Sequence, residues 1–235
     1  EPTMDGTASL IYLLAAKENE ASPKSPPVEK APSKSPPKGE TSEALLNKKI
    51  SFDHGAIIRG TQNKKQIALV FTADEFGDGG NTILNTLQKH NVKASFFFTG
   101  RFYRNPAYKN VITQLKQQGH YLGPHSDQHL LYADWTNRDS LLVTREQFDK
   151  DITACLSSIE KYGVKRSAIK YFIPPYEWYN DSIAKWTKQK GIQLINYSPG
   201  TKSTADYTTP DMKNYRSTAE IYQSIIDKEK QDGLN

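Results

Sequence analysis

Short apolar runs alternate with helical patterns from about residue 66 onward. The runs are continuous, as in Ile67-Ala-Leu-Val-Phe71 and Phe96-Phe-Phe98, which predicts strands buried on both faces. The stretches between them carry apolar residues at helical spacing. We expect strands at residues 66–74, 93–100, 120–126, 171–176 and 192–198, and helices at residues 81–91, 106–119, 145–163, 181–191 and 217–232.

This alternation predicts an α/β fold. Strands that alternate with helices and are apolar throughout form a parallel sheet with helices outside, either an open doubly wound sheet or a barrel. In both arrangements the chemistry gathers at the carboxyl ends of the strands. Residues that follow directly on a predicted strand are therefore the first candidates for a functional site.

The composition divides the chain into three parts. Residues 17–50 are rich in Pro, Lys, Ser and Glu, as in Ser22-Pro-Lys-Ser-Pro-Pro27, which predicts a disordered linker. Residues 1–16 form a short N-terminal segment, interpreted as the end of a preceding domain, and their apolar stretch is too short to span a membrane. Residues 51–235 form the folded domain, which we expect to lack its last strand because no strand pattern follows its last helix.

Charge and cysteine content narrow the possible functions. The net charge is +5, but the lysines are spread over the linker and the outer faces of predicted helices, with no basic and aromatic stripe. Binding to nucleic acid is therefore not expected. The single cysteine, Cys155, falls within a helical apolar pattern and is interpreted as a core residue rather than a nucleophile.

Two acidic residues and two histidines follow predicted strands. Asp74 and Glu75 come after the first strand, and His125-Ser-Asp-Gln-His129 comes after the third. Adjacent carboxylates are costly to bury unless a metal, a partner charge or water receives them, and two imidazoles four positions apart can bind one ion if the segment turns helically. We expect the four side chains to meet at one edge of the sheet, with three metal ligands and the remaining carboxylate as general base.

A third segment, Phe172-Ile-Pro-Pro-Tyr-Glu-Trp178, follows the fourth strand. Pro175, Tyr176 and Trp178 are candidates for substrate binding, because aromatic side chains suit stacking on sugar rings, although burial in the core explains them equally well. A Pro-Pro-Tyr turn also fixes a backbone N–H of the kind that stabilises an oxyanion.

From about residue 67 to residue 235 the chain resembles the polysaccharide deacetylase family, which has the NodB homology domain and is also called carbohydrate esterase family 4. The family's Thr-Phe-Asp-Asp motif is similar to Thr72-Ala-Asp-Glu75, and its His-Ser/Thr-x-x-His motif matches His125-Ser-Asp-Gln-His129 at every defined position. Its Arg-x-Pro-Tyr motif is similar to Ile173-Pro-Pro-Tyr176.

The resemblance implies a distorted (β/α) barrel with fewer than eight strands. It implies Asp74 as the base, and Glu75, His125 and His129 as ligands of a divalent metal, usually zinc. The N–H of Tyr176 would stabilise the oxyanion. The implied partner is an acetylated polysaccharide or glycan, and the family's usual export implies an extracytoplasmic location, which is periplasmic, cell-surface or secreted.

Three departures from the family pattern are visible. Glu75 replaces the ligand Asp, and Ile173 replaces an Arg that orients the base, so Asp74 is expected to lack the charge partner that would lower its pKa. The family's fourth motif is echoed only by Ala205-Asp-Tyr207. A fifth motif, ending in the His that acts as general acid, would follow Asn235.

The function expected from these residues is metal-dependent hydrolysis of N- or O-linked acetyl groups on a carbohydrate polymer. Two alternatives remain open. One is a catalytically impaired carbohydrate-binding domain of the same fold, and the other is a hydrolase of non-peptide C–N bonds.

Overall fold

The computed structural model describes residues 50–60 and 66–232. The predicted N-terminal segment and almost all of the predicted linker lie outside the described residues. Within the described part, no helix is long and apolar enough to cross a membrane.

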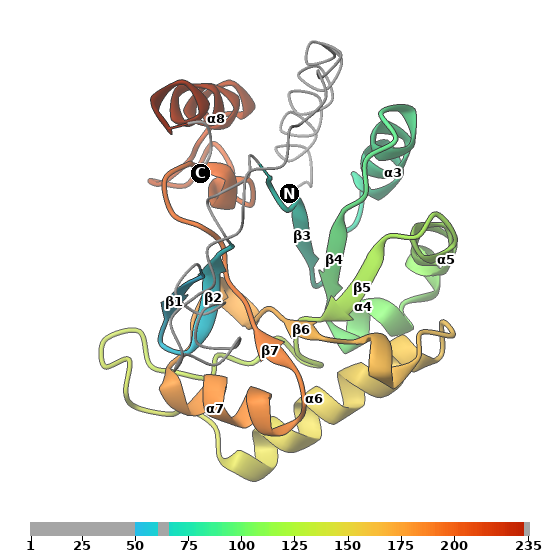
Figure 1. Cartoon of the computed structure of the whole chain (residues 1–235), viewed down its shortest axis with the longest axis vertical. Helices are drawn as coiled ribbons and strands as arrows, with labels where there is room; N and C mark the ends of the chain where they lie inside the picture. The colour runs from blue at the N-terminus through green and yellow to red at the C-terminus, as the bar shows by residue number, and fades with distance from the viewer. Residues whose placement is uncertain (1–49, 61–65, 233–235) are drawn as a thin grey trace, which may run out of the picture.

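The strands lie in three small sheets (Figure 1). The largest sheet is parallel, in the order β3 (Val70–Ala73), β4 (Ser95–Phe98) and β5 (Tyr121–Pro124). A second parallel sheet pairs β6 (Tyr171–Phe172) with β7 (Gln193–Leu194). An antiparallel hairpin pairs β1 (Ser51–Asp53) with β2 (Ala56–Arg59).

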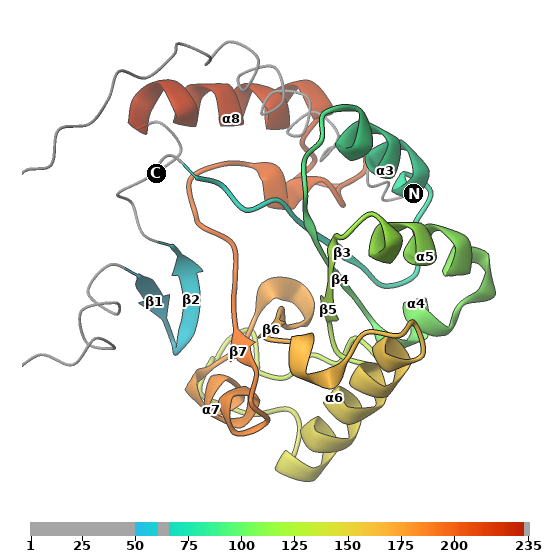
Figure 2. The ribbon, with the colours of Figure 1, turned by 45° about the vertical axis from the view of Figure 1, so that its right-hand side comes forward.

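Single backbone contacts join these sheets into one curved wall. The N–H of Ile173, just after β6, donates to the carbonyl of Pro124 at the end of β5 over 3.4 Å. An isolated parallel bridge between Ile57 and Ile195 connects β2 to the end of β7. The strands therefore follow one another around an incomplete barrel in the order β3, β4, β5, β6, β7, β2, β1, and Figure 2 shows this curvature.

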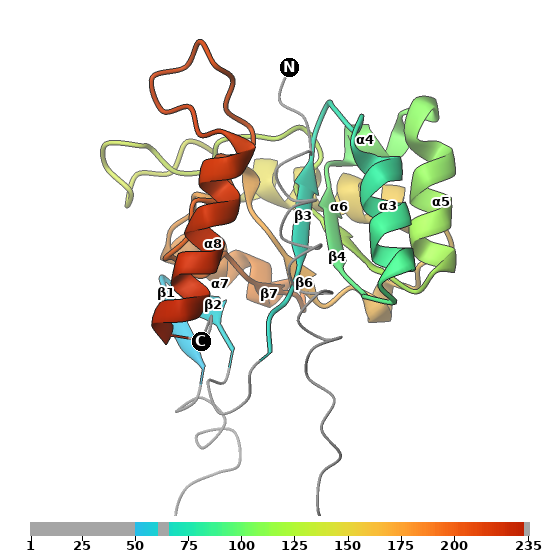
Figure 3. The ribbon, with the colours of Figure 1, turned by 90° about the horizontal axis from the view of Figure 1, so that it is seen from above.

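The helices pack around this wall. They are α3 (Gly80–Lys89), α4 (Gly100–Arg104), α5 (Lys109–Gln117), α6 (Arg145–Glu160), α7 (Asp181–Gln189) and α8 (Thr218–Asp232). Seen from above, α3 and α5 lie side by side on one flank of β3 and β4, and α8 lies on the other side of β3 (Figure 3). Helix α6 begins with a capping box, in which Thr144 and Gln147 each satisfy the other's backbone N–H.

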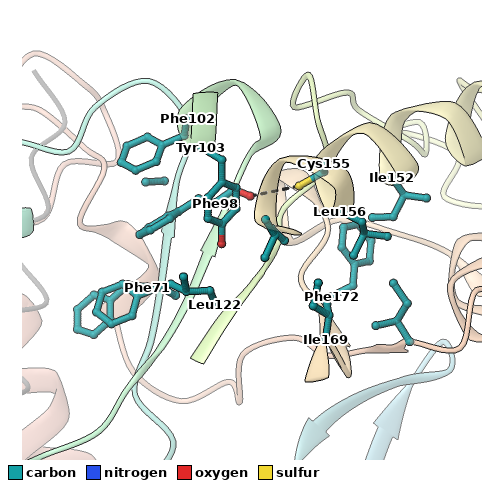
Figure 4. Packing of buried hydrophobic residues seen from close by; sticks show 14 of the residues in the cluster. Phe71, Phe98, Phe102, Tyr103, Leu122, Ile152, Cys155, Leu156, Ile169 and Phe172 are labelled. Atoms are coloured by element: carbon teal, nitrogen blue, oxygen red, sulfur yellow. Dashed lines mark hydrogen bonds between the residues drawn. The ribbon is translucent and has the colours of Figure 1, made fainter. Parts of the chain in front are cut away.

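The main core lies between the strands and α6 (Figure 4). Phe98 of β4 and Phe172 of β6 are buried together with Ile152 and Leu156 of α6. Cys155 lies among them, and its thiol donates to the carbonyl of Phe98 over 3.5 Å. Burial raises the pKa of this thiol, so Cys155 is a core residue, as the sequence predicted.

Every strand and helix predicted from the sequence is present, and each is shorter than predicted. The fold class, a distorted (β/α) barrel with fewer than eight strands, is confirmed. The sequence pattern did not reveal the β1–β2 hairpin or α4. Helix α4 has only five residues, too few for a helical period to be visible.

Candidate active site

The predicted site forms where β3, β4 and β5 end together. Their register pairs Ala73 with Phe98 and Phe98 with Pro124, so the residues that follow leave the sheet at one level. Asp74 and His125 are the next residues after β3 and β5. The carboxylate of Asp74 comes within 3.7 Å of Nδ1 of His129, so the predicted meeting of these two segments is observed.

Two imidazoles four positions apart could bind one ion if their segment turned helically, but the segment from His125 to His129 forms a bend instead. Ser126 and His129 both adopt left-handed backbone conformations, with φ of 68° and 56°, and the hydroxyl of Ser126 accepts the N–H of His129 over 2.7 Å. This bend brings the two imidazole rings to a centroid distance of 5.1 Å. The two histidines therefore lie together, although by a different backbone path.

A buried carboxylate holds this bend in place. Asp151 of α6 accepts the backbone N–H of Asp127 over 3.1 Å and that of Gln128 over 3.0 Å, and it also accepts the hydroxyl of Tyr132 over 2.7 Å. Because Asp151 is almost completely buried, its carboxylate is shielded from water that would compete for these hydrogen bonds. Sequence reasoning missed this residue because it reads as an ordinary polar position of a helix.

Helix α4 supports the bend from the other side. Arg104 donates two hydrogen bonds to the carboxylate of Asp127, over 2.5 and 2.9 Å, and a third to the hydroxyl of Ser158 over 2.9 Å. A Cβ atom at Gly100 would run into that same carboxylate of Asp127. Position 100 therefore needs glycine because the bend passes directly over it.

Both histidines have the chemistry of metal ligands. Nδ1 of His125 lies 2.9 Å from the carbonyl of Ile173, which fixes the ring and leaves Nε2 outside that bond. Burial lowers the pKa of His125 to about 3 and also lowers the pKa of His129, so both rings are neutral at pH 7. Neutral imidazole is the form that binds a metal.

Asp74 has a charge partner, so the expectation that it lacks one is wrong. Nε of Arg101, in the first turn of α4, donates to Oδ1 of Asp74 over 2.5 Å, and Nη2 of Arg101 donates to Oδ2. Burial alone would raise the pKa of Asp74, but the hydrogen bonds and the positive charge of Arg101 hold it below its usual value. Ile173 itself is buried in the core.

The residues fit a divalent metal only in part. His125 and His129 are placed as a pair, but Glu75 is 58% exposed and its Oε1 lies 3.3 Å from Nη2 of Arg101. Within residues 50–60 and 66–232, no group of three or more His, Cys, Asp or Glu side chains is placed to hold a metal. The two imidazoles suit a metal, but the carboxylate of Glu75 is not placed with them as a third ligand.

Aromatic side chains line the rim beside the histidines. The ring of Tyr176, which has a left-handed φ of 60°, lies 4.5 Å from that of His129. Trp135 contacts Tyr176 edge-on at 5.8 Å and stacks on Trp178 at 5.3 Å. Tyr176 and Trp135 are exposed, whereas Pro175 is buried and shapes the turn. Trp135 was not predicted, since no motif marks the long segment in which it lies.

Comparisons with known proteins agree with this arrangement. The sequence pattern of the family described as polysaccharide deacetylase matches residues 59–195. The chain is 27% identical, over 165 residues, to the peptidoglycan-N-acetylmuramic acid deacetylase PdaA of Bacillus subtilis. That match covers 69% of this chain and 56% of the relative, so the chain spans about half of the relative's length.

Solved structures show the same fold. A family 4 carbohydrate esterase from Bacillus anthracis superposes with a TM-score of 0.57 at 26% identity, covering 83% of this chain and 87% of that one. A family 4 pseudoenzyme from the same organism superposes with a TM-score of 0.55 at 18% identity, covering 77% and 66%, and shares the fold. With more than half of its residues matched by the family pattern, the chain belongs to the polysaccharide deacetylase family.

Proposed function

We propose that this protein hydrolyses acetyl groups from a carbohydrate polymer, with a peptidoglycan-like glycan as the first candidate. One observation carries the proposal: the carboxylate of Asp74 and two neutral imidazoles, His125 and His129, lie together at the carboxyl edge of the sheet. The similarity to PdaA, a deacetylase of N-acetylmuramic acid in peptidoglycan by its name, supports the choice of substrate.

The family is generally metal-dependent, and the imidazole pair suits that role. His125 and His129 would hold a divalent metal, with zinc as the first candidate and Glu75 as the third ligand that the resemblance implies. Such a metal supplies an activated water for attack on the acetyl carbonyl.

The chain's own residues would do the remaining work. Asp74 would take the proton of the attacking water, and the backbone N–H of Tyr176 would stabilise the charge that develops on the carbonyl oxygen. The exposed ring of Tyr176 and the half-buried ring of Trp178, with Pro175 shaping their turn, would bind the sugar ring that carries the acetyl group. Attack on the acetyl carbonyl releases acetate and leaves a free amine or hydroxyl on the sugar.

A glycan substrate of this kind also suggests where the protein acts. Because peptidoglycan lies outside the cytoplasm, we propose a periplasmic, cell-surface or secreted location. Fractionation of cells that express the full protein would test this location independently of the activity.

Acetate release and bound metal test the proposed function together. The protein, loaded with zinc, is given peptidoglycan, acetylated chitooligosaccharide or acetylated xylan, and acetate and metal content are measured. We expect the unchanged protein to release acetate. His125→Ala and His129→Ala should lose both the acetate release and the bound metal. The matched control is His54→Asn, which changes a histidine at the β1–β2 turn and should leave both measurements unchanged.

The two alternatives predict different products. Glycan binding without acetate release would support a catalytically impaired binding domain and contradict the proposed reaction. Release of ammonia from a nitrogen-containing substrate, without acetate, would support hydrolysis of a non-peptide C–N bond.

A further inference from the structure

Arg101 binds the carboxylate of Asp74 in the candidate site, and neither the motifs nor the comparisons assign it a role. We propose that Arg101 is the positioning residue that holds the carboxylate of Asp74 in place for catalysis. This inference rests on the proposed function. It assigns to α4 the task that the resemblance gives to an arginine at the position of Ile173.

The contact has the geometry of a positioning interaction. Arg101 binds both carboxylate oxygens of Asp74 through two different nitrogens, Nε and Nη2, which is the paired arrangement that a guanidinium forms with a carboxylate. Two parallel bonds restrict rotation of the carboxylate in a way that one bond cannot. Nη2 also lies 3.3 Å from Oε1 of Glu75, so a single side chain contacts both acids of the motif.

The backbone of Arg101 is tied to the segment that carries the histidines. The N–H groups of Gly100 and Arg101 donate to the carbonyls of Ser126 and Asp127, over 2.9 and 3.2 Å. The hydroxyl of Thr99 accepts the N–H of Phe102 and caps the helix. Arg101 is therefore held at a defined distance from the histidines, and its guanidinium positions Asp74 relative to them.

The surroundings of Ile173 explain why the charge comes from another element. The side chain of Ile173 is 4% exposed and its carbonyl lies 2.9 Å from Nδ1 of His125. The backbone at this position orients a histidine, while the side chain fills the core. Arg101 lies in α4, the helix that directly follows β4. Because β4 is the neighbour of β3, Arg101 reaches the carboxylate of Asp74 from the side of β4.

The test separates positioning from a general structural effect. Arg101→Met, Arg101→Lys and Arg101→Met/Ile173→Arg are compared with Arg145→Met, whose arginine is also 39% exposed and also pairs with an aspartate, but lies at the start of α6. The readouts are kcat and KM for acetate release, and the affinity of the metal-free protein for zinc.

We expect kcat of Arg101→Met to fall about 10- to 100-fold with KM unchanged, as for other residues that orient a catalytic group. Arg101→Lys restores part of the loss, since lysine supplies the charge without the fork. The double variant recovers activity relative to Arg101→Met if the guanidinium can act from position 173. Arg145→Met retains the kcat of the unchanged protein, and zinc affinity is the same in the three single variants.

Two results would overturn the inference while leaving the proposed function intact. One is a kcat of Arg101→Met equal to that of the unchanged protein. The other is tighter zinc binding together with a higher kcat in Arg101→Met, because Arg101 would then compete with the metal for the acids. If the unchanged protein binds zinc but releases no acetate from any glycan, the proposed function fails first, and the inference fails with it.

Discussion

Replacement of Asp151 by alanine should loosen the segment that carries both histidines. The carboxylate accepts two backbone N–H groups, of Asp127 and Gln128, and the hydroxyl of Tyr132, and it is 6% exposed. Each buried donor left without an acceptor costs about 1–3 kcal/mol. Since the new space admits some water and the bend can relax, we expect Asp151→Ala to lower the free energy of unfolding by about 3–5 kcal/mol.

Urea unfolding followed by circular dichroism measures this loss. The matched control is Asp149→Ala, which removes an aspartate two positions earlier in α6 that is paired with Arg145 and Lys190 at the surface. Such surface pairs contribute about 0–1 kcal/mol. Zinc affinity should also fall in Asp151→Ala and remain unchanged in the control. A loss of stability in Asp151→Ala no larger than in Asp149→Ala would refute the role given to Asp151.

Three further changes test other parts of the site and the core. Trp135→Ala should raise KM for a chitooligosaccharide about 2- to 10-fold with kcat unchanged, because a stacking contact is worth about 0.5–1.5 kcal/mol; a fall in kcat alone would contradict a binding role. Gly100→Ala should destabilise the protein by about 1–3 kcal/mol in urea unfolding, since its Cβ meets the carboxylate of Asp127, whereas Gly60→Ala, with open space around it, should be neutral. Burial lowers the pKa of His120 from 6.5 to about 4, so the folded state binds this proton more weakly than the unfolded state, and stability should fall by up to about 3 kcal/mol as the pH drops through that range. His120→Leu should lack this loss of stability at low pH. If the stability of His120→Leu depended on pH in the same way as that of the unchanged protein, the loss could not be assigned to His120.

The order and type of the elements could be predicted because each strand is a continuous apolar run and each helix has an apolar face. Their ends could not, because ladder hydrogen bonds are formed only where neighbouring strands are present: Ile67 lies in the predicted first strand, but it is 43% exposed and the strand begins at Val70. The meeting of Asp74 with His129 was predictable for a related reason, since parallel strands end at one edge.

Contacts made through space were not predictable in the same way. The exposed side chain of Glu75 contacts the guanidinium of Arg101, and nothing in the sequence indicates this partner. The pairing of Arg101 with Asp74 depends on α4, which is too short to show a helical pattern in the sequence. The departure at Ile173 suggested a missing charge, but a motif records only where relatives place a group. It does not reveal whether another element supplies the same charge.

Helix α4 accounts for most of what the motifs left unexplained. Its two arginines lie three positions apart and reach different parts of the site. Arg101 binds Asp74, which follows β3. Arg104 binds both Asp127, which lies between the two histidines in the sequence, and Ser158 of α6. Five residues thus connect the candidate base, the candidate metal ligands and α6, the longest helix within the described residues. Because the two arginines act on separate acids, Arg104→Met should loosen the histidine segment and weaken zinc binding, whereas Arg101→Met should lower kcat with zinc binding intact. If both variants changed the same quantity, α4 would act only as a structural support, and the separate positioning of the base would have to be abandoned.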